Sequence, residues 1–110
     1  KLRPFVTTSL NRSPQLPDVP TLSESGLPGF QVDAWCGMLA PAGTPGSIVL
    51  KLQKEISKVL HSTDVKEKLT AAGFEPVGDS PDTFAALIRL EMAKWSKLIQ
   101  DVGIKPEAFK

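Results

Sequence analysis

Prolines divide this chain into two parts that are expected to fold differently. Seven of its ten prolines lie at or before Pro45, where they separate short apolar runs. Beyond Pro45 the sequence consists mainly of long periodic segments rich in lysine, glutamate, leucine and alanine. Because proline disrupts a helix interior and lacks a backbone donor, the first part predicts strands and ordered loops, and the second part predicts helices.

The first part contains two candidate strands joined by a proline-rich connection. Residues 2–8 are rich in strand-forming types, and Pro4 restricts them to an edge strand or to one that starts after it. Residues 9–29 hold four prolines, which predicts an ordered connection without regular secondary structure. Apolar and other residues alternate over residues 30–38, which is the strongest strand pattern in the chain.

The second part predicts two helices in succession. Thr44 is the expected N-cap of a first helix that begins at Pro45, and its apolar stripe extends to Leu60. A short second helix is expected over residues 64–72, where Asp64 and Glu67 have the spacing of a capping box, and the glycine that follows is placed to end it.

A third and longer helix is expected near the end of the chain. Ser80 and Pro81 have the cap-then-proline order of a helix start, apolar residues follow at helical spacing, and Gly103 is placed to end the helix. Residues 74–78 are a candidate for a small edge strand. Two long helices and one short helix around a few strands predict an α/β layer arrangement.

Size and charge limit what the chain can do. A length of 110 residues allows one small domain at most. A formal net charge of +1, with both signs interspersed, argues against a surface for nucleic acid or for anionic membranes. No run approaches the roughly 18 apolar residues that a membrane-spanning helix needs. We therefore expect a globular domain with no nucleic-acid partner.

No catalytic constellation is visible. Cys36, the only cysteine, lies on the apolar side of the alternating segment, which predicts a packed side chain rather than a nucleophile. His61, the only histidine, lies at the end of the first helix, where an imidazole interacts with the last carbonyls. One cysteine and one histidine are too few for a zinc cluster, so no metal or other cofactor is expected. Asp79 and Asp82 flank the start of the third helix, where capping explains them better than acid–base chemistry.

The two tryptophans differ in their expected roles. Trp95 belongs to the apolar stripe of the third helix and is predicted to lie in the core. Trp35 projects from the other face of the alternating segment, beside Asp33. It either lines a ligand cleft or covers the far side of the sheet. The glycine-rich stretch at residues 26–29 lacks the lysine and the following helix of a phosphate loop, and is interpreted as a turn.

Several motifs resemble those of the tripartite tricarboxylate transporter receptors, also called Bug proteins. They are LPDVPTLSESGLPGF at residues 16–30 and WCGMLAPAGTP at residues 35–45, followed by the stretches at residues 69–78 and 95–105. The resemblance covers essentially the whole chain. Trp35 matches the family's recurrent tryptophan, whereas Cys36 and Pro4 stand where the family usually has an aromatic and a small residue.

This resemblance implies a fragment of a two-lobed, periplasmic-binding-protein-like fold that closes on its ligand. It implies the carboxyl-terminal portion of a receptor two to three times as long. Residues 1–30 would be the last strand and the proline-rich connection of the second lobe. Residues 31–110 would be the strand that crosses the hinge and the carboxyl-terminal helices of the first lobe. The whole chain would form one compact fragment.

The same resemblance implies a function in transport. The family captures small organic carboxylates in the periplasm and delivers them to membrane transporter subunits, with no covalent step, so no enzyme is expected. By analogy, Asp33, Ala34 and Trp35 lie nearest the ligand cleft. An alternative is a self-associating fragment, a homodimer formed through faces that the missing half would cover. A thiol enzyme using Cys36 is a more distant alternative.

Overall fold

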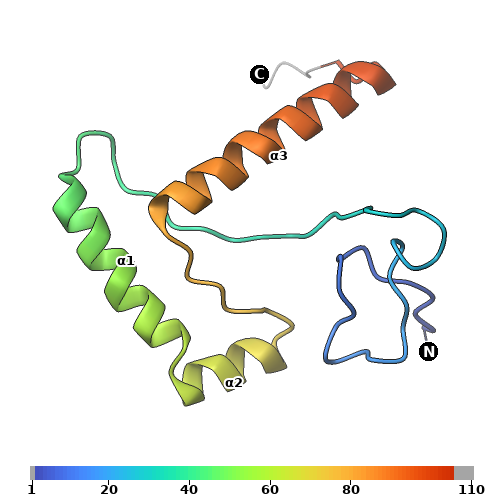
Figure 1. Ribbon diagram of the computed structural model, residues 1–110, viewed down its shortest axis with the longest axis horizontal. Coiled ribbons are helices and arrows are strands. Elements are labelled where there is room, and N and C mark those ends of the chain that lie inside the picture. The colour runs from blue at the N-terminus through green and yellow to red at the C-terminus, as the bar shows by residue number, and fades with distance from the viewer. Residues whose placement is uncertain (1, 106–110) are drawn as a thin grey trace. The chain divides into compact units, whose positions relative to one another are not determined.

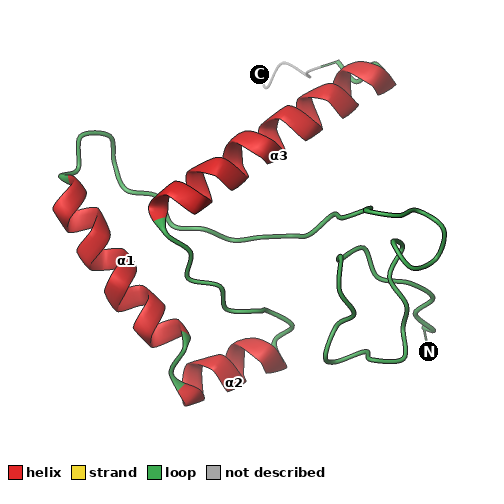
Figure 2. Cartoon of the chain, viewed as in Figure 1, coloured by secondary structure: helices red, strands yellow, loops and turns green. Residues whose placement is uncertain are grey.

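The computed structural model describes residues 2–105 and divides the chain into two compact units, Lys1–Leu39 and Ala40–Lys110. Three helices, α1 (Gly46–Leu60), α2 (Thr63–Ala71) and α3 (Pro81–Val102), all belong to the second unit (Figure 1). The first unit consists of turns and extended segments (Figure 2). None of the three helices in the described residues has both the length and the apolar composition that a membrane span requires.

The strands predicted over residues 2–8, 30–38 and 74–78 are wrong for the described part of the chain. Residues 2–105 contain a single isolated bridge, between Thr7 and Thr21 in parallel orientation. The amide of Thr7 donates to the carbonyl of Pro20 at 3.0 Å, and its carbonyl accepts from the amide of Leu22 at 2.9 Å. A strand needs a second segment that continues the ladder. Here Pro20 and the turn that begins at Thr21 end the pairing after one residue.

The proline-rich connection is ordered, as predicted, by a succession of turns. Residues 14–15, 17–19 and 22–26 form turns or bends, and Gly26 and Gly29 adopt positive φ values of 113° and 77°. The only buried residues of the described chain lie in this connection: Val19, which is 9% exposed, and Thr21, which is fully buried. The connection therefore forms the interior of the first unit.

Helix α1 confirms the first predicted helix but begins one residue later. Pro45 is its N-cap, and the hydroxyl of Thr44 donates to the carbonyl of Pro41 at 2.8 Å instead of accepting from a helix amide. At the other end, Nδ1 of His61 lies 2.8 Å from the carbonyl oxygen of Ser57. This contact confirms the role predicted for the histidine at the helix end.

Helix α2 confirms the second predicted helix, but its capping box was placed wrongly. The helix begins at Thr63 after the N-cap Ser62, so Asp64 lies inside its first turn. The helix ends at Ala71 with Ala72 as its C-cap, and the predicted glycine, Gly73, follows with a φ of 86°. The amide of Gly73 donates to Thr70 and the amide of Phe74 donates to Leu69, the hydrogen-bond pattern of a Schellman motif.

Helix α3 begins and ends where the sequence predicted. The hydroxyl of Ser80 accepts from the amide of Thr83 at 3.1 Å, and Pro81 occupies the first turn. Gly103 ends the helix in a left-handed conformation, with φ of 73°. Its amide donates to Gln100, and the next amide, that of Ile104, donates to Ile99. A second Schellman motif thus closes the helix.

Helix α1 contacts both other helices and the connection between them. The side chain of Gln53 donates from Nε2 to the carbonyl oxygen of Gly78 at 3.1 Å. Gly78 has a φ of +70°, and a Cβ atom added there would lie 2.9 Å from Oγ of Ser57 and 3.3 Å from Cε1 of His61. The connection between α2 and α3 can therefore approach α1 this closely only because residue 78 has no side chain.

The apolar stripe of α3 is covered along only part of its length. Phe84, Leu87 and Ile88, in the first half of the helix, are half-buried. Its second half is exposed, and we call these residues the uncovered stripe: Trp95, Leu98, Ile99 and Val102. Trp95 is therefore not the core residue that its spacing predicted. Its indole N–H donates to Oε2 of Glu91 at 2.7 Å, and Nζ of Lys94 lies 5.1 Å from its ring centre.

Candidate functional site

The residues predicted to contact ligand lie together on one exposed segment of the first unit. Asp33, Ala34 and Trp35 are all exposed, with Trp35 exposed to 44%. The carboxylate of Asp33 accepts a hydrogen bond from Nε2 of Gln31 at 2.6 Å. The three residues are therefore open to a ligand, and their proximity follows from sequence adjacency alone. Their role in ligand binding stays a prediction.

Cys36 directly follows Trp35 and is a free, exposed cysteine. The prediction that it packs in the core is wrong, because alternation buries one face only where a second layer covers the strand. The described residues contain no group of three or more histidines, cysteines, aspartates or glutamates that could hold a metal ion.

Two backbone hydrogen bonds fix the start of residues 31–39, which we call the candidate segment. The amide of Val32 donates to the carbonyl of Thr8 at 2.9 Å, and the amide of Phe30 donates to the carbonyl of Leu27 at 3.0 Å. The first bond joins the segment to Thr8, in the bend at residues 8–11, and the second closes the turn that precedes it. The segment is thus held from two directions immediately before Asp33.

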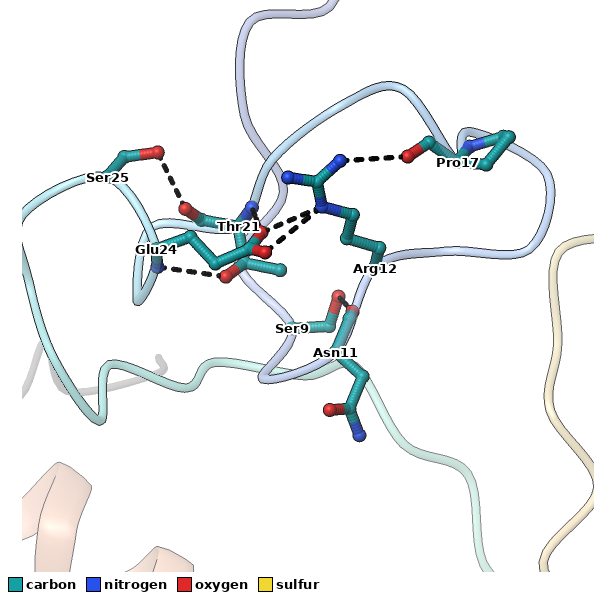
Figure 3. Close-up of polar contacts among 7 residues, drawn as sticks. All are labelled: Ser9, Asn11, Arg12, Pro17, Thr21, Glu24 and Ser25. Atoms are coloured by element: carbon teal, nitrogen blue, oxygen red, sulfur yellow. Dashed lines mark hydrogen bonds and ion pairs between the residues drawn. The ribbon is translucent and has the colours of Figure 1, made fainter.

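Sequence reasoning missed a cluster of polar contacts that organises the connection (Figure 3). The hydroxyl of Thr21 accepts from the amide of Glu24 at 3.2 Å, and the carboxylate of Glu24 accepts from the amide of Thr21 at 2.8 Å. These reciprocal bonds form a capping box. Its signal, a threonine followed three residues later by a glutamate, is present in the sequence at residues 21–24.

Arg12 completes this cluster from a distant part of the connection. Its Nε lies 3.1 and 3.0 Å from the two carboxylate oxygens of Glu24, and its Nη1 donates to the carbonyl of Pro17 at 3.1 Å (Figure 3). We call Arg12, Thr21 and Glu24 the Arg12–Glu24 clasp. Hydrogen bonds from the Arg12 guanidinium, and next from the Thr21 amide, lower the pKa of Glu24. The Glu24 carboxylate therefore takes up a proton only at a lower pH than an ordinary glutamate does.

The chemistry of the exposed segment suits binding through donors. The backbone amides and the indole of Trp35 are hydrogen-bond donors, which a carboxylate can accept from. An ionised Asp33 only accepts hydrogen bonds, so it would repel a carboxylate and attract a hydroxyl, an ammonium group or water.

Comparison with known proteins identifies the class of this chain. The model of the tripartite tricarboxylate transporter family receptor matches residues 1–104. A UPF0065 protein from the tcbD–tcbE intergenic region of Pseudomonas sp. strain P51 is 47% identical over 100 residues, which are 90% of this chain and 30% of that protein. Protein BugT of Bordetella pertussis is 35% identical over 104 residues, which are 94% of this chain and 32% of BugT.

Two solved structures share the fold. The structure of R. palustris Rpa4515 with adipate matches with a TM-score of 0.76 and 36% identity, over 91% of this chain and 33% of that one. The periplasmic binding protein BugD matches with a TM-score of 0.75 and 36% identity, over 91% of this chain and 34% of BugD.

The fold is therefore that of a part of a periplasmic binding protein. The chain belongs to the tripartite tricarboxylate transporter receptor family, which confirms the resemblance found in the sequence. It spans about a third of the length of each of the four proteins named above. Its assignment to the carboxyl-terminal portion and the division between lobes at residue 30 stay predictions.

Proposed function

We propose that this chain supplies one part of the ligand site of a periplasmic receptor that captures a small organic carboxylate. The receptor would deliver that carboxylate to the membrane subunits of a tripartite tricarboxylate-type transporter. The observation that carries the proposal is the likeness, over nine-tenths of the chain, to a family structure solved with adipate. The description of BugD as a periplasmic binding protein supports the location.

Within this proposal, residues 33–35 contact the ligand. The amide of Ala34 and the indole of Trp35 donate to a ligand carboxylate, and the exposed ring of Trp35 covers the ligand's hydrocarbon part. Asp33 disfavours a second negative charge beside it and favours ligands that place a hydroxyl or ammonium group there. Further contacts come from parts of the receptor outside this chain.

The proposed closing motion follows from the predicted lobe assignment. Residues 1–30 belong to one lobe and residues 31–110 to the other, with the segment at residues 31–39 crossing between them. Small dihedral changes in a few crossing residues are enough to reorient two lobes. A ligand that contacts residues 33–35 would then contact the segment that this assignment gives to the crossing.

Calorimetry tests the proposal with adipate as the first ligand and citrate and glutamate as comparisons. The protein is used as its gene encodes it, and Trp35→Ala is the test variant. Met38→Ala is the matched control, because Met38 is an exposed apolar residue of the same segment outside residues 33–35. We expect Trp35→Ala to weaken adipate binding and Met38→Ala to leave it unchanged. Equal affinities for both variants would contradict the assignment of Trp35.

A second candidate function is self-association through the uncovered stripe. Four large side chains exposed along one helix face form a surface that folded proteins usually cover, and a second copy could cover it. Light scattering of the 110-residue chain would then show a dimer that Leu98→Asn converts to a monomer. A monomer at all concentrations, with a melting temperature independent of concentration, would eliminate this candidate.

A further inference from the structure

The Arg12–Glu24 clasp lies outside the predicted ligand-binding residues but is joined to them by short chains of hydrogen bonds. Its two charged members are 12 residues apart in sequence, and their side chains are about half exposed. An exposed ion pair of this kind contributes little stability by itself. Its significance therefore depends on which parts of the backbone it holds.

One route leads from Glu24 through the buried Thr21 to the candidate segment. Glu24 holds the amide of Thr21, and the residues on either side of Thr21 bond to the backbone of Thr7. The next carbonyl, that of Thr8, accepts from the amide of Val32 at 2.9 Å. Three successive hydrogen-bonded steps thus connect the carboxylate of Glu24 to the residue that precedes Asp33.

A second route runs through the turn that the capping box opens. The hydroxyl of Ser23, inside the box, accepts from the amide of Gly29 at 3.0 Å. The carbonyl of Leu22 accepts from the amide of Leu27, whose own carbonyl accepts from Phe30. The turn therefore sets the direction in which the chain continues toward residues 33–35. Both routes begin at the same capping box, and they end at Val32 and Phe30, within three residues of Asp33.

We propose that the Arg12–Glu24 clasp positions residues 33–35 for ligand binding, with Arg12 and Glu24 as positioning residues that do not touch the ligand. This inference rests on the proposed function of residues 33–35. A loop held in its binding conformation loses less entropy when the ligand binds, so the clasp raises affinity without a contact of its own. Opening the clasp should free the segment while leaving α1, α2 and α3 folded.

The test uses Glu24→Ala, Glu24→Gln and Arg12→Lys in a Trp95→Phe background. Trp35 is then the only tryptophan among these 110 residues. Glu24→Ala removes both the ion pair and the capping bond. Glu24→Gln keeps an acceptor for the Thr21 amide and removes the charge. Arg12→Lys keeps the charge, but a single ammonium group cannot reproduce the contacts of a guanidinium with both Glu24 and Pro17.

The matched control is Glu55→Gln. Glu55 forms an ion pair of 2.9 Å with Lys58 on α1, both side chains are more than half exposed, and the pair makes no bond to the candidate segment. Two readouts are taken on each folded variant. They are the Trp35 emission maximum with its quenching by acrylamide, and the dissociation constant for adipate. Circular dichroism establishes that the helices are intact.

We expect Glu24→Ala to shift Trp35 emission, increase quenching and weaken adipate binding by about tenfold, as the loss of a pre-ordered binding loop predicts. Glu24→Gln and Arg12→Lys should give smaller changes in the same direction, and Glu55→Gln none. If Glu24→Ala does not fold, the results for Glu24→Gln and Arg12→Lys test the inference. Unchanged Trp35 emission in the variants, or unchanged affinity in a receptor that binds adipate, overturns the inference. If the unsubstituted receptor does not bind adipate, the proposed ligand is wrong, while Trp35 emission still decides whether the clasp positions the segment.

Discussion

Replacing Gly78 by alanine tests the packing of the connection between α2 and α3 against α1. An alanine at φ of +70° is strained by about 1–2 kcal/mol. Its Cβ would also lie 2.9 Å from Oγ and 3.3 Å from Cβ of Ser57, an overlap that adds about 1 kcal/mol. Rotation of the serine hydroxyl can relieve only the shorter of these two contacts. We therefore expect Gly78→Ala to destabilise the chain by about 2–3 kcal/mol.

Gly43→Ala is the matched control for this substitution. Gly43 has a similar φ of +83°, but nothing lies within 4 Å of the position that its Cβ would occupy. Gly43→Ala should therefore cost only the backbone strain, about 1–2 kcal/mol. The difference between the losses of unfolding free energy in the two variants measures the effect of the contact with α1.

Urea unfolding followed by circular dichroism measures both free energies of unfolding. The double variant Gly78→Ala with Ser57→Ala should recover part of the loss, because it removes the hydroxyl that lies closest to the new Cβ. Equal destabilisation by Gly78→Ala and Gly43→Ala, with no recovery in the double variant, would refute the close approach.

Three further predictions concern the helix cap, the clasp and the ligand. Ser80→Ala removes the hydroxyl that accepts from the Thr83 amide, so it should destabilise the chain by about 1 kcal/mol in urea unfolding. Ser62→Ala should cost less, because the Ser62 hydroxyl donates to carbonyl and carboxylate oxygens and caps no helix amide. Folding lowers the pKa of Glu24, so the stability that its ionised carboxylate contributes is present above about pH 4.3, the pKa of an unfolded glutamate. That stability is lost as the pH falls through the lower pKa of the folded state. Unfolding measured at decreasing pH should accordingly show a smaller loss of stability in Glu24→Gln than in the unsubstituted chain. Asp33→Asn should strengthen the binding of a plain dicarboxylate in calorimetry, and weaker binding would show that Asp33 attracts the ligand.

The features predicted correctly from sequence are those that local interactions determine. The start and end of α3 follow from Ser80, Pro81 and Gly103, whose caps need only residues of the helix itself and its immediate neighbours. The family was recognisable because its motifs at residues 16–30 and 35–45 are continuous in the sequence. Neither inference required knowledge of distant contacts.

The features predicted wrongly depend on contacts that local patterns do not contain. Alternation over residues 30–38 indicated a strand with Cys36 packed, but a ladder and a covering layer must come from elsewhere, and Cys36 is exposed. The capping box at residues 21–24 was missed because the prolines around it pointed to a connection. It stabilises a single turn, since Gly26 leaves helical geometry with φ of 113°. Arg12 joins that turn from nine residues before Thr21, a pairing that spacing alone does not predict.

The most direct test of the central claim is a crystal structure of the protein, as its gene encodes it, in complex with adipate. We predict a ligand carboxylate within hydrogen-bond distance of the Ala34 amide or the Trp35 indole, with the Arg12–Glu24 clasp closed. Adipate bound with none of its atoms in contact with residues 33–35 would contradict the account.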